Sequence, residues 1–170
     1  MLAAMASGVN SLKPLIRIRE KAWPKAGDRL VFAAGPKRGR VITKADLALG
    51  EAALAFPQGK EGNEENIITL VRLAPEEFLP PTKVEWTAEG FVAYSAICTH
   101  LACTVLERLE GGGGGEVIHC PCHAGFYDPR RKAKVVGGPP PRPLPQLPIR
   151  INEQGEIIAA GEFDAPVGVL

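Results

Sequence analysis

The chain has 170 residues, with 20 Lys and Arg against 19 Asp and Glu, which gives a formal charge of +1. This near neutrality excludes a nucleic-acid binder that acts through bulk positive charge, because neutralising a phosphate backbone needs a surplus of cations. The sequence contains no run of 18 apolar residues of the kind that spans a bilayer. At 45% hydrophobic and 23% charged residues, it is typical of one globular domain with a buried core.

The first half of the chain is dominated by strand patterns that Gly and Pro interrupt. Period-two alternation and β-branched runs predict strands at 15–19, 29–32, 66–73, 83–86 and 90–97. A helix is expected over 45–56, although Gly50 weakens it. Residues 58–66 are a polar turn region, and Pro75 is placed to open one helical turn over 75–78.

The composition changes between residues 98 and 145. All four cysteines lie there, together with five consecutive glycines at 111–115 and a Gly- and Pro-rich run at 137–143. Strand patterns return at 147–151 and 156–159, with a turn between them that predicts a hairpin. The sequence therefore predicts an all-β, antiparallel fold of the sandwich or barrel-like kind, with a small subdomain inserted in it.

Two short motifs in the insert carry the chemistry: Cys98-Thr99-His100-Leu101-Ala102-Cys103 and Cys120-Pro121-Cys122-His123. We refer to them as box one and box two. Each supplies a Cys and a His at short spacing plus one additional Cys, and two such pairs on two loops are suited to one metal centre.

Two metals fit these residues. Zinc would take Cys98, His100, Cys120 and His123 in a tetrahedral site, but the other two cysteines would then have no role as ligands. An iron–sulfur cluster with mixed ligands takes two Cys on one iron and two His on the other. A structural zinc module without redox activity remains the alternative.

The pattern resembles the Rieske family, whose boxes read C-x-H-x-G-C and C-x-C-H-G-S in many members. The resemblance is specific over about residues 95–145 and implies one [2Fe-2S] cluster per chain. It implies Cys98 and Cys120 as thiolate ligands, and His100 and His123 as the imidazole ligands of the outer iron. His119 matches no ligand position and is expected to be an ordinary strand residue.

Three further features follow from the resemblance. Cys103 and Cys122 match the pair that forms a disulfide in the quinol-oxidising branch of the family, which implies an oxidising compartment. The run 137–143 resembles the proline-rich loop that covers the cluster, and prolines would make it a stiff lid. Leu101 matches the apolar shield over the cluster.

Box two departs from the family pattern. Ala124 and Gly125 replace the family's Gly-Ser pair, and the resemblance implies that losing the Ser hydroxyl lowers the reduction potential. Tyr127 is retained, and its phenol is expected to donate to Cys98 and to hold the potential partly up. In box one, Ala102 stands where Gly is frequent, so we expect a negative φ there.

The resemblance implies a function in a respiratory cytochrome bc-type complex. The chain would accept an electron, coupled to a proton, from quinol, and pass it to a c-type cytochrome, with cytochrome b as a further partner. His123 is expected to contact the quinol, and His100 is the other titrating ligand. Such a protein works at the outer, periplasmic-side face of the cytoplasmic membrane.

The resemblance also implies an organisation of the chain. Residues 1–14 would be a hinge or the stub of a missing N-terminal membrane anchor, 15–94 plus 146–170 a β base domain, and 95–145 the cluster-binding subdomain. Two other members of the family remain as alternatives: the Rieske subunit of an arsenite-oxidase-like enzyme, and a soluble Rieske ferredoxin. The basic residues at 130–134 are either a solvated loop or a docking surface for an acidic cytochrome.

Overall fold

The computed structural model describes residues 22–106, 109–112 and 115–170. The strand expected at 15–19 and the segment 1–14 lie outside these residues. The strands are β1 (Leu30–Phe32), β2 (Ala52–Pro57), β3 (Ile68–Arg72), β4 (Phe91–Ser95), β5 (Leu109–Gly112), β6 (Gly115–Cys120), β7 (Gly125–Asp128), β8 (Lys134–Gly137), β9 (Gln146–Leu147), β10 (Ile149–Ile151) and β11 (Ile157–Ala159). Single 3₁₀ turns are η1 (Glu64–Asn66), η2 (Pro75–Glu77), η3 (Val84–Trp86) and η4 (Pro129–Arg131).

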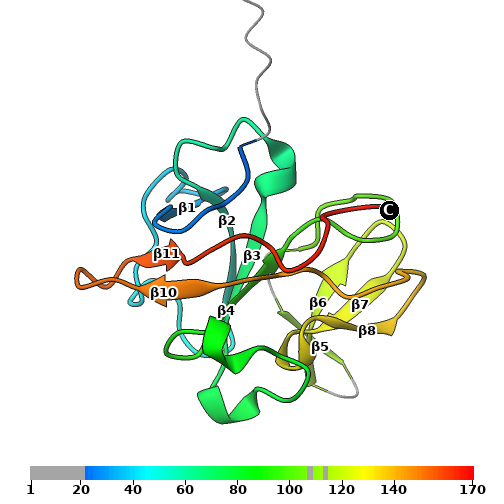
Figure 1. Cartoon of the computed structure of the whole chain (residues 1–170). Coiled ribbons are helices and arrows are strands. Elements are labelled where there is room, and N and C mark those ends of the chain that lie inside the picture. The colour runs from blue at the N-terminus through cyan, green and yellow to red at the C-terminus, as the bar shows by residue number, and fades with distance from the viewer. Residues whose placement is uncertain (1–21, 107–108, 113–114) are drawn as a thin grey trace, which may run out of the picture.

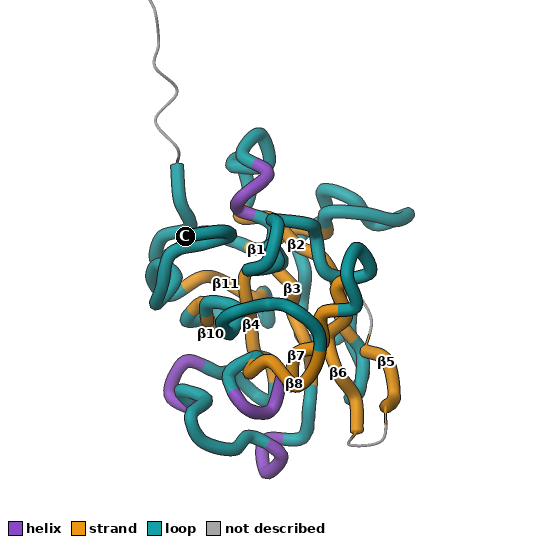
Figure 2. Tube along the Cα trace, turned by 90° about the vertical axis from the view of Figure 1, so that its right-hand side faces the viewer, coloured by secondary structure: helices purple, strands orange, loops and turns teal. Residues whose placement is uncertain are grey.

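All strand pairs within the three sheets are antiparallel. One sheet has the order β1-β2-β3-β4-β9, β10 and β11 form a hairpin, and β5 to β8 form a four-stranded meander beside the larger sheet (Figure 1 and Figure 2). The predicted all-β, antiparallel class is confirmed. Within the ranges given above, no helix is long and apolar enough to cross a membrane.

Most of the predicted elements are present. The strands expected at 29–32, 66–73 and 90–97 are β1, β3 and β4, and the turn at Pro75 is η2. The C-terminal hairpin is also confirmed, because Ile151 pairs with Ile157 across the predicted turn. The two described ends of the glycine run lie on β5 and β6, where Gly112 pairs with Gly115.

Two predicted elements are wrong. The segment 45–56 is not a helix: its second half is β2, whose residues alternate between half-buried and buried and pair with β3. Gly50, at φ +80°, takes a left-handed conformation that ends any helical path before the strand begins. The segment 83–86 is the turn η3 instead of a strand, because the backbone N–H of Trp86 bonds locally to the carbonyl of Lys83.

The buried side chains form two apolar clusters. One lies on the five-stranded sheet and the β10–β11 hairpin and includes Leu30, Ile68 and Phe91. The other lies between β4 and the four-stranded sheet, and it includes Tyr94, Ile118, Tyr127, Leu144 and the two cysteines Cys98 and Cys120. The apolar core therefore continues to the base of the two boxes.

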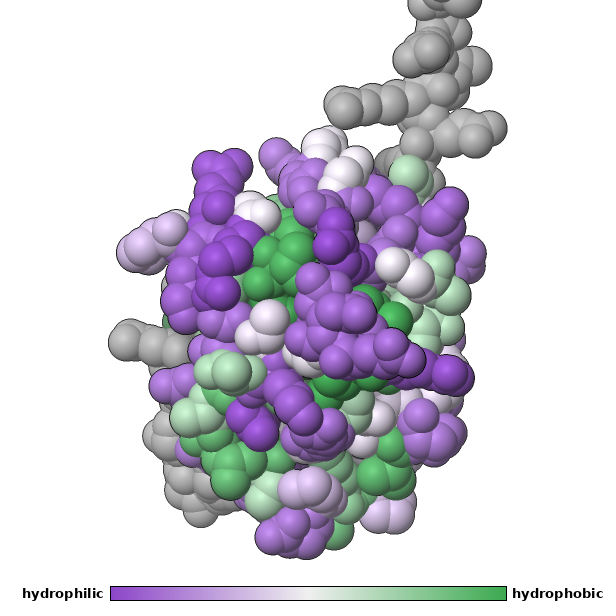
Figure 3. All heavy atoms as spheres, turned by 90° about the vertical axis from the view of Figure 1, so that its left-hand side faces the viewer, coloured by the Kyte–Doolittle hydropathy of each residue, from purple (hydrophilic) through white to green (hydrophobic). Residues whose placement is uncertain are grey.

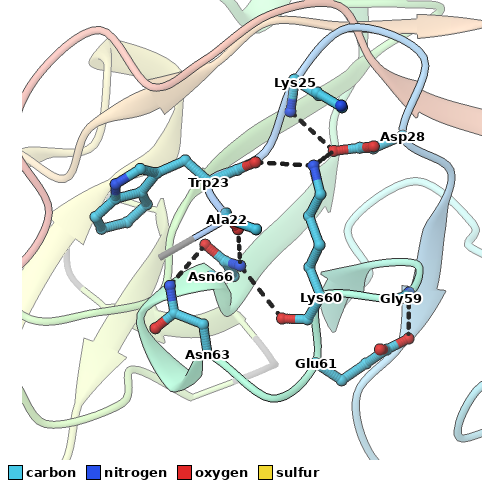
Figure 4. Close-up of polar contacts among 9 residues, drawn as sticks. All are labelled: Ala22, Trp23, Lys25, Asp28, Gly59, Lys60, Glu61, Asn63 and Asn66. Carbon is cyan, nitrogen blue, oxygen red and sulfur yellow. Dashed lines mark hydrogen bonds and ion pairs between the residues drawn. The ribbon is translucent and has the colours of Figure 1, made fainter. Parts of the chain in front are cut away.

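The loop after β2 fixes the start of the described chain (Figure 4). The fully buried Asn66 donates from Nδ2 to the carbonyl of Ala22, at 2.8 Å, and to that of Lys60, at 3.2 Å. Nζ of Lys60 donates to the carbonyl of Trp23, at 2.9 Å, and forms an ion pair with Asp28. These bonds hold residues 22–28 against the base of the fold.

The turn η4 joins the four-stranded sheet to the rest of the molecule. The hydroxyl of Tyr94 donates to the carbonyl of Pro129, at 2.8 Å, and Oγ1 of Thr82 donates to the carbonyl of Arg130, at 2.8 Å. The backbone N–H of Lys132 donates in turn to Oγ1 of Thr82, at 2.6 Å. The part of the fold that carries box two is thus bonded firmly to β4 and its preceding loop.

On the face viewed in Figure 3, an apolar patch lies between hydrophilic side chains in the upper half, and further apolar side chains lie in the lower half. A cavity of about 280 Å³ is bounded by Phe32, Ala34, Leu47 and Ala53, with Lys37 at its side. Its lining residues come from β1, β2 and the loops between them, and none belongs to either box.

Candidate metal centre

The two boxes lie on loops that the sheets place next to each other. Box one follows β4 directly, and its turn is closed by the backbone N–H of Cys98, which donates to the carbonyl of Cys103 at 2.8 Å. The N–H of Ala102 donates back to the carbonyl of Cys98, at 3.0 Å. Box two is the turn between β6, which ends at Cys120, and β7, which begins at Gly125.

In both turns, alanine and not glycine occupies a left-handed position. Ala102 has φ +60° and Ala124 has φ +52°, so the negative φ expected at Ala102 is wrong. An L-residue in this region costs roughly 1–2 kcal/mol. The hydrogen bonds that close box one impose the conformation at Ala102 despite this cost, and alanine is the smallest side chain that could carry it.

The first pair of donor residues is a pair of buried thiols. Cys98 and Cys120 are 2% and 1% exposed and lie in one apolar cluster, one from each box. Burial raises the pKa of the Cys120 thiol, and the neighbouring Cys98 raises it further. Two adjacent thiolates are unfavourable in such surroundings unless a cation compensates them, which is what a metal supplies.

The second pair is formed by the two box histidines. The rings of His100 and His123 meet edge to face, with centroids 4.8 Å apart. Nδ1 of His100 is buried and finds no hydrogen-bond partner in the part of the chain that the structure describes. His123, in contrast, is exposed. A buried imidazole nitrogen without a protein partner fits a metal ligand, because a buried polar atom otherwise requires a hydrogen bond.

A disulfide joins the boxes beside these donors. Cys103 and Cys122 are bonded, as the resemblance implies, with their Cα atoms 6.6 Å apart. The sulfur atoms of Cys103, Cys120 and Cys122 all lie within 4.8 Å of one another. The bond therefore fixes the spacing of the two loops immediately next to the buried thiol of Cys120.

Tyr127 lies beneath box one, as expected from the sequence. Its Oη is 3.2 Å from Sγ of Cys98 and accepts a hydrogen bond from the backbone N–H of Thr99, at 3.3 Å. Burial raises the pKa of the Tyr127 hydroxyl, with a contribution from Cys98. The phenol stays protonated at neutral pH and can donate to a thiolate on Cys98.

The run 137–143 covers both boxes, and we refer to residues 137–142 as the lid. Oγ1 of the buried Thr99 donates to the carbonyl of Arg142, at 2.7 Å. At Gly138 the lid touches box two so closely that a Cβ would lie 2.1 Å from the carbonyl oxygen of Ala124. The sequence places Thr99 in box one and Gly138 in the proline-rich run but assigns neither a role, because each acts through a contact with a distant segment.

Three of the four basic residues at 130–134 pair within the chain. Nε of Arg130 lies 2.8 Å from Asp128, and Arg131 lies 3.7 Å from the same carboxylate. Lys132 pairs with Asp164, at 2.7 Å. These contacts do not favour the 130–134 segment as a docking surface for an acidic partner.

Two cysteines and two histidines on adjacent, disulfide-joined loops of a small antiparallel β protein are the features of a Rieske-type iron–sulfur protein. Comparison with protein families matches residues 60–148 to the Rieske [2Fe-2S] domain. The chain belongs to the Rieske family, and its cofactor is a [2Fe-2S] cluster.

Similar proteins include subunits of two respiratory enzymes. A protein of Haloferax mediterranei named putative respiratory nitrate reductase subunit Rieske is 39% identical over 98% of this chain and 74% of its own length. The cytochrome bc1 complex Rieske iron-sulfur subunit of Streptomyces lividans is 33% identical over 91% of this chain and 92% of its own. Among solved structures, the cyanobacterial plasma membrane Rieske protein PetC3 from Synechocystis PCC 6803 aligns with a TM-score of 0.46 and 22% identity, over 70% of this chain and 95% of that one.

Proposed function

We propose that Cys98 and Cys120 hold one iron of the cluster and that His100 and His123 hold the other. The adjacent buried thiols and the edge-to-face imidazoles support this assignment. So does Nδ1 of His100, which is buried without a hydrogen-bond partner in the described residues. The Cys103–Cys122 disulfide joins the two boxes next to these donors.

The function proposed for the chain is that of the Rieske subunit of a cytochrome bc-type complex, which takes an electron and a proton from quinol and passes the electron to a c-type cytochrome. The cluster supplies one-electron redox chemistry when it is bound. The chain would work at the periplasmic-side face of the cytoplasmic membrane, where a disulfide between the boxes persists. The same disulfide argues against a soluble Rieske ferredoxin, since those proteins generally lack this cysteine pair.

The observation that carries this proposal is that His123 is exposed on a surface of uncharged residues, which we name the tip. Leu101, from the other box, is 59% exposed and follows His100, whose ring meets that of His123. No Asp, Glu, Lys or Arg occurs in the three tip segments, 99–104, 121–125 and 137–141. Such a surface fits an apolar partner pocket, and the exposure of His123 supports its proposed role as the residue that accepts a proton from a quinol hydroxyl.

The first experiment is a redox titration of the purified, cluster-containing protein between pH 6 and pH 10. If the two histidines hold the cluster and titrate, the midpoint potential falls as pH rises, by about 59 mV per pH unit for each coupled proton. A potential independent of pH over this range would contradict the proton-coupled function.

The second experiment tests the tip with decylubiquinol as the reductant. Leu101→Asp places a charge in the uncharged tip and is expected to slow reduction of the protein about tenfold, a cost of roughly 1.4 kcal/mol. The matched control is Val84→Asp on η3, a residue 53% exposed and outside the tip. Equal rates for the two variants would show that quinol does not meet the protein at the tip.

A second candidate function is that of a Rieske subunit in a respiratory nitrate reductase, favoured by the 39% identical protein of Haloferax mediterranei. The two functions differ in where the electron goes. Protein purified from its source with its natural partners distinguishes them: nitrate reoxidises the reduced cluster in one case, and a c-type cytochrome does so in the other. No specific observation favours an arsenite-oxidase-like partner.

A further inference from the structure

The lid needs an anchor outside the two boxes. Three of the four residues at 139–142 are prolines, which lack a backbone N–H, so beyond Gly137, the last residue of β8, the lid cannot be held by a strand ladder. On its inner side it is held by the hydrogen bond from Thr99 to the carbonyl of Arg142. The Arg142 side chain provides the second attachment: its Nη2 donates to the carbonyl of Gly168.

The segment that receives Arg142 is itself fixed at two places. Residues 164–168, which we name the strap, begin at Asp164, whose backbone N–H donates to the carbonyl of Gln146 at 3.0 Å. The Asp164 carboxylate accepts from the N–H of Gln146 at 2.9 Å, and it pairs with Lys132 at 2.7 Å. The strap continues the C-terminal run drawn in red in Figure 1, which leads from β11 towards the loops of the boxes.

The other end of the strap packs against the entrance to box one. Gly168 has φ +76°, and a Cβ on it would lie 3.4 Å from Cγ2 of Ile97, which directly precedes Cys98. Arg142 therefore ties together three segments that are distant in the sequence: the lid by its own backbone, box one through Thr99, and the strap through its guanidinium.

We propose that Arg142 is a positioning residue, which uses the strap to hold the lid over the two boxes and so limits the access of water and other solutes to the cluster. This inference rests on the proposed ligand set in one respect, which is that those ligands place the cluster under the lid. It does not depend on whether quinol is the electron donor. Losing the guanidinium removes the attachment to the strap and leaves the bond from Thr99 and the contacts with box two, so the lid opens more often while the sheets stay folded.

The test compares three changes in the full chain. Arg142→Ala removes the donor, Arg142→Lys retains a cation that can reach the carbonyl, and a chain shortened after Val167 removes the acceptor. Hydrogen exchange at the amides of Gly137, Gly138 and Arg142 reports lid opening directly, and loss of visible absorbance in excess chelator reports access to the cluster. Arg150→Ala, an exposed strand residue on β10, is the matched control.

We expect Arg142→Ala to speed exchange at the lid amides and cluster loss by about tenfold, with exchange in β3 and β4 unchanged. Arg142→Lys should recover part of the protection, and Arg150→Ala should lose none. Because donor and acceptor form one bond, Arg142→Ala in the shortened chain should add little to either change alone.

Two results would overturn the proposal. One is unchanged lid exchange in Arg142→Ala. The other is a full, additive effect of that substitution in the shortened chain, which would mean that Arg142 does not act through Gly168. If Arg142→Ala fails to fold, comparison of Arg142→Lys with the shortened chain gives the same decision. Failure of the decylubiquinol assay would leave these readouts unaffected, so the two proposals fail separately.

Discussion

Pro140 of the lid occupies the space next to Gly125 in box two: a Cβ built on Gly125 would lie 2.7 Å from Cγ of Pro140 and 3.4 Å from Cβ of Cys120. Both residues are buried. Gly125 stands where many Rieske proteins have a Ser, so the missing hydroxyl and the close approach of the lid are one structural feature. In this chain the space of a serine side chain is filled by the pyrrolidine ring of Pro140.

The first prediction concerns this contact. Gly125→Ser should destabilise the protein by about 1–3 kcal/mol and lower its cluster content, because the added side chain displaces the lid. Denaturant unfolding and iron analysis measure the two effects. Pro140→Ala in the same chain should recover most of the loss by making room. Gly125→Ser that is as stable as the parent would show that the lid yields without cost.

The second prediction concerns Tyr127. Tyr127→Phe removes the hydroxyl next to Sγ of Cys98 and should lower the midpoint potential. In the parent, a hydrogen bond from this hydroxyl stabilises the more negative, reduced cluster, and the variant loses that stabilisation. About 1 kcal/mol of such preference corresponds to about 40 mV for one electron. Tyr94→Phe is the control: its hydroxyl is also buried but donates to the carbonyl of Pro129. Tyr94→Phe should cost stability without moving the potential, and equal shifts in both variants would contradict a specific role for Tyr127.

The third prediction concerns stability against pH. Burial raises the pKa of the Asp164 carboxyl, but Lys132, the N–H of Gln146 and Lys83 outweigh it, so the pKa is lowered from its usual 3.8. The ionised carboxylate therefore stabilises the folded chain above about pH 3.8, and this contribution is lost as pH falls towards the lowered pKa.

Asp164→Asn should accordingly lower the free energy of unfolding by about 2 kcal/mol at pH 7, and the difference from the parent should shrink in acid. Unfolding in urea at several pH values measures it. Glu89→Gln removes an exposed ion pair with Lys44 and should change stability by less than about 1 kcal/mol. A constant deficit of Asp164→Asn down to pH 2.5 would exclude the ion pairs as its cause.

The fourth prediction concerns the disulfide. Replacing Cys103 and Cys122 together by Ala should lower the free energy of unfolding by about 3 kcal/mol, the chain-entropy value for a loop closed over 19 residues. The variant should also release its cluster faster in chelator, because only the surrounding packing then keeps box one next to box two. A variant that keeps both the stability and the cluster lifetime of the parent would show that the lid and Tyr127 suffice to hold the boxes.

The sequence predicted the elements whose signals are local. The strands at 66–73 and 90–97 are β-branched or apolar runs with clear ends, and their residues are buried in β3 and β4. The box motifs likewise predicted the disulfide and the contact between Tyr127 and Cys98, because the resemblance to the family implied both. The ligand set and the division into base and cluster subdomains stay predictions.

The errors have two causes: a distant partner overrode the local pattern over 45–56, and local turn bonds did so at 83–86 and at Ala102. Apolar residues over 45–56 fit a helix, but pairing with β3 makes 52–57 a strand. At Ala102 the closed turn of box one imposes a positive φ that alanine alone disfavours. The bonds from Arg142 to Gly168 and from Thr99 to the lid join residues more than 25 positions apart, so no motif of consecutive residues could indicate them.

The short connection between β4 and box one has a mechanical consequence. Cys98 lies three residues after the end of a fully buried strand in the five-stranded sheet, and η4 bonds the box-two side to Tyr94 of the same strand. A force applied to the boxes by a docking partner is therefore transmitted through β4 to the sheet, because the connecting segment is too short to deform much. The two boxes and the five-stranded sheet should therefore move as one rigid unit when a partner docks, and this rigidity originates in β4 and not in the metal site.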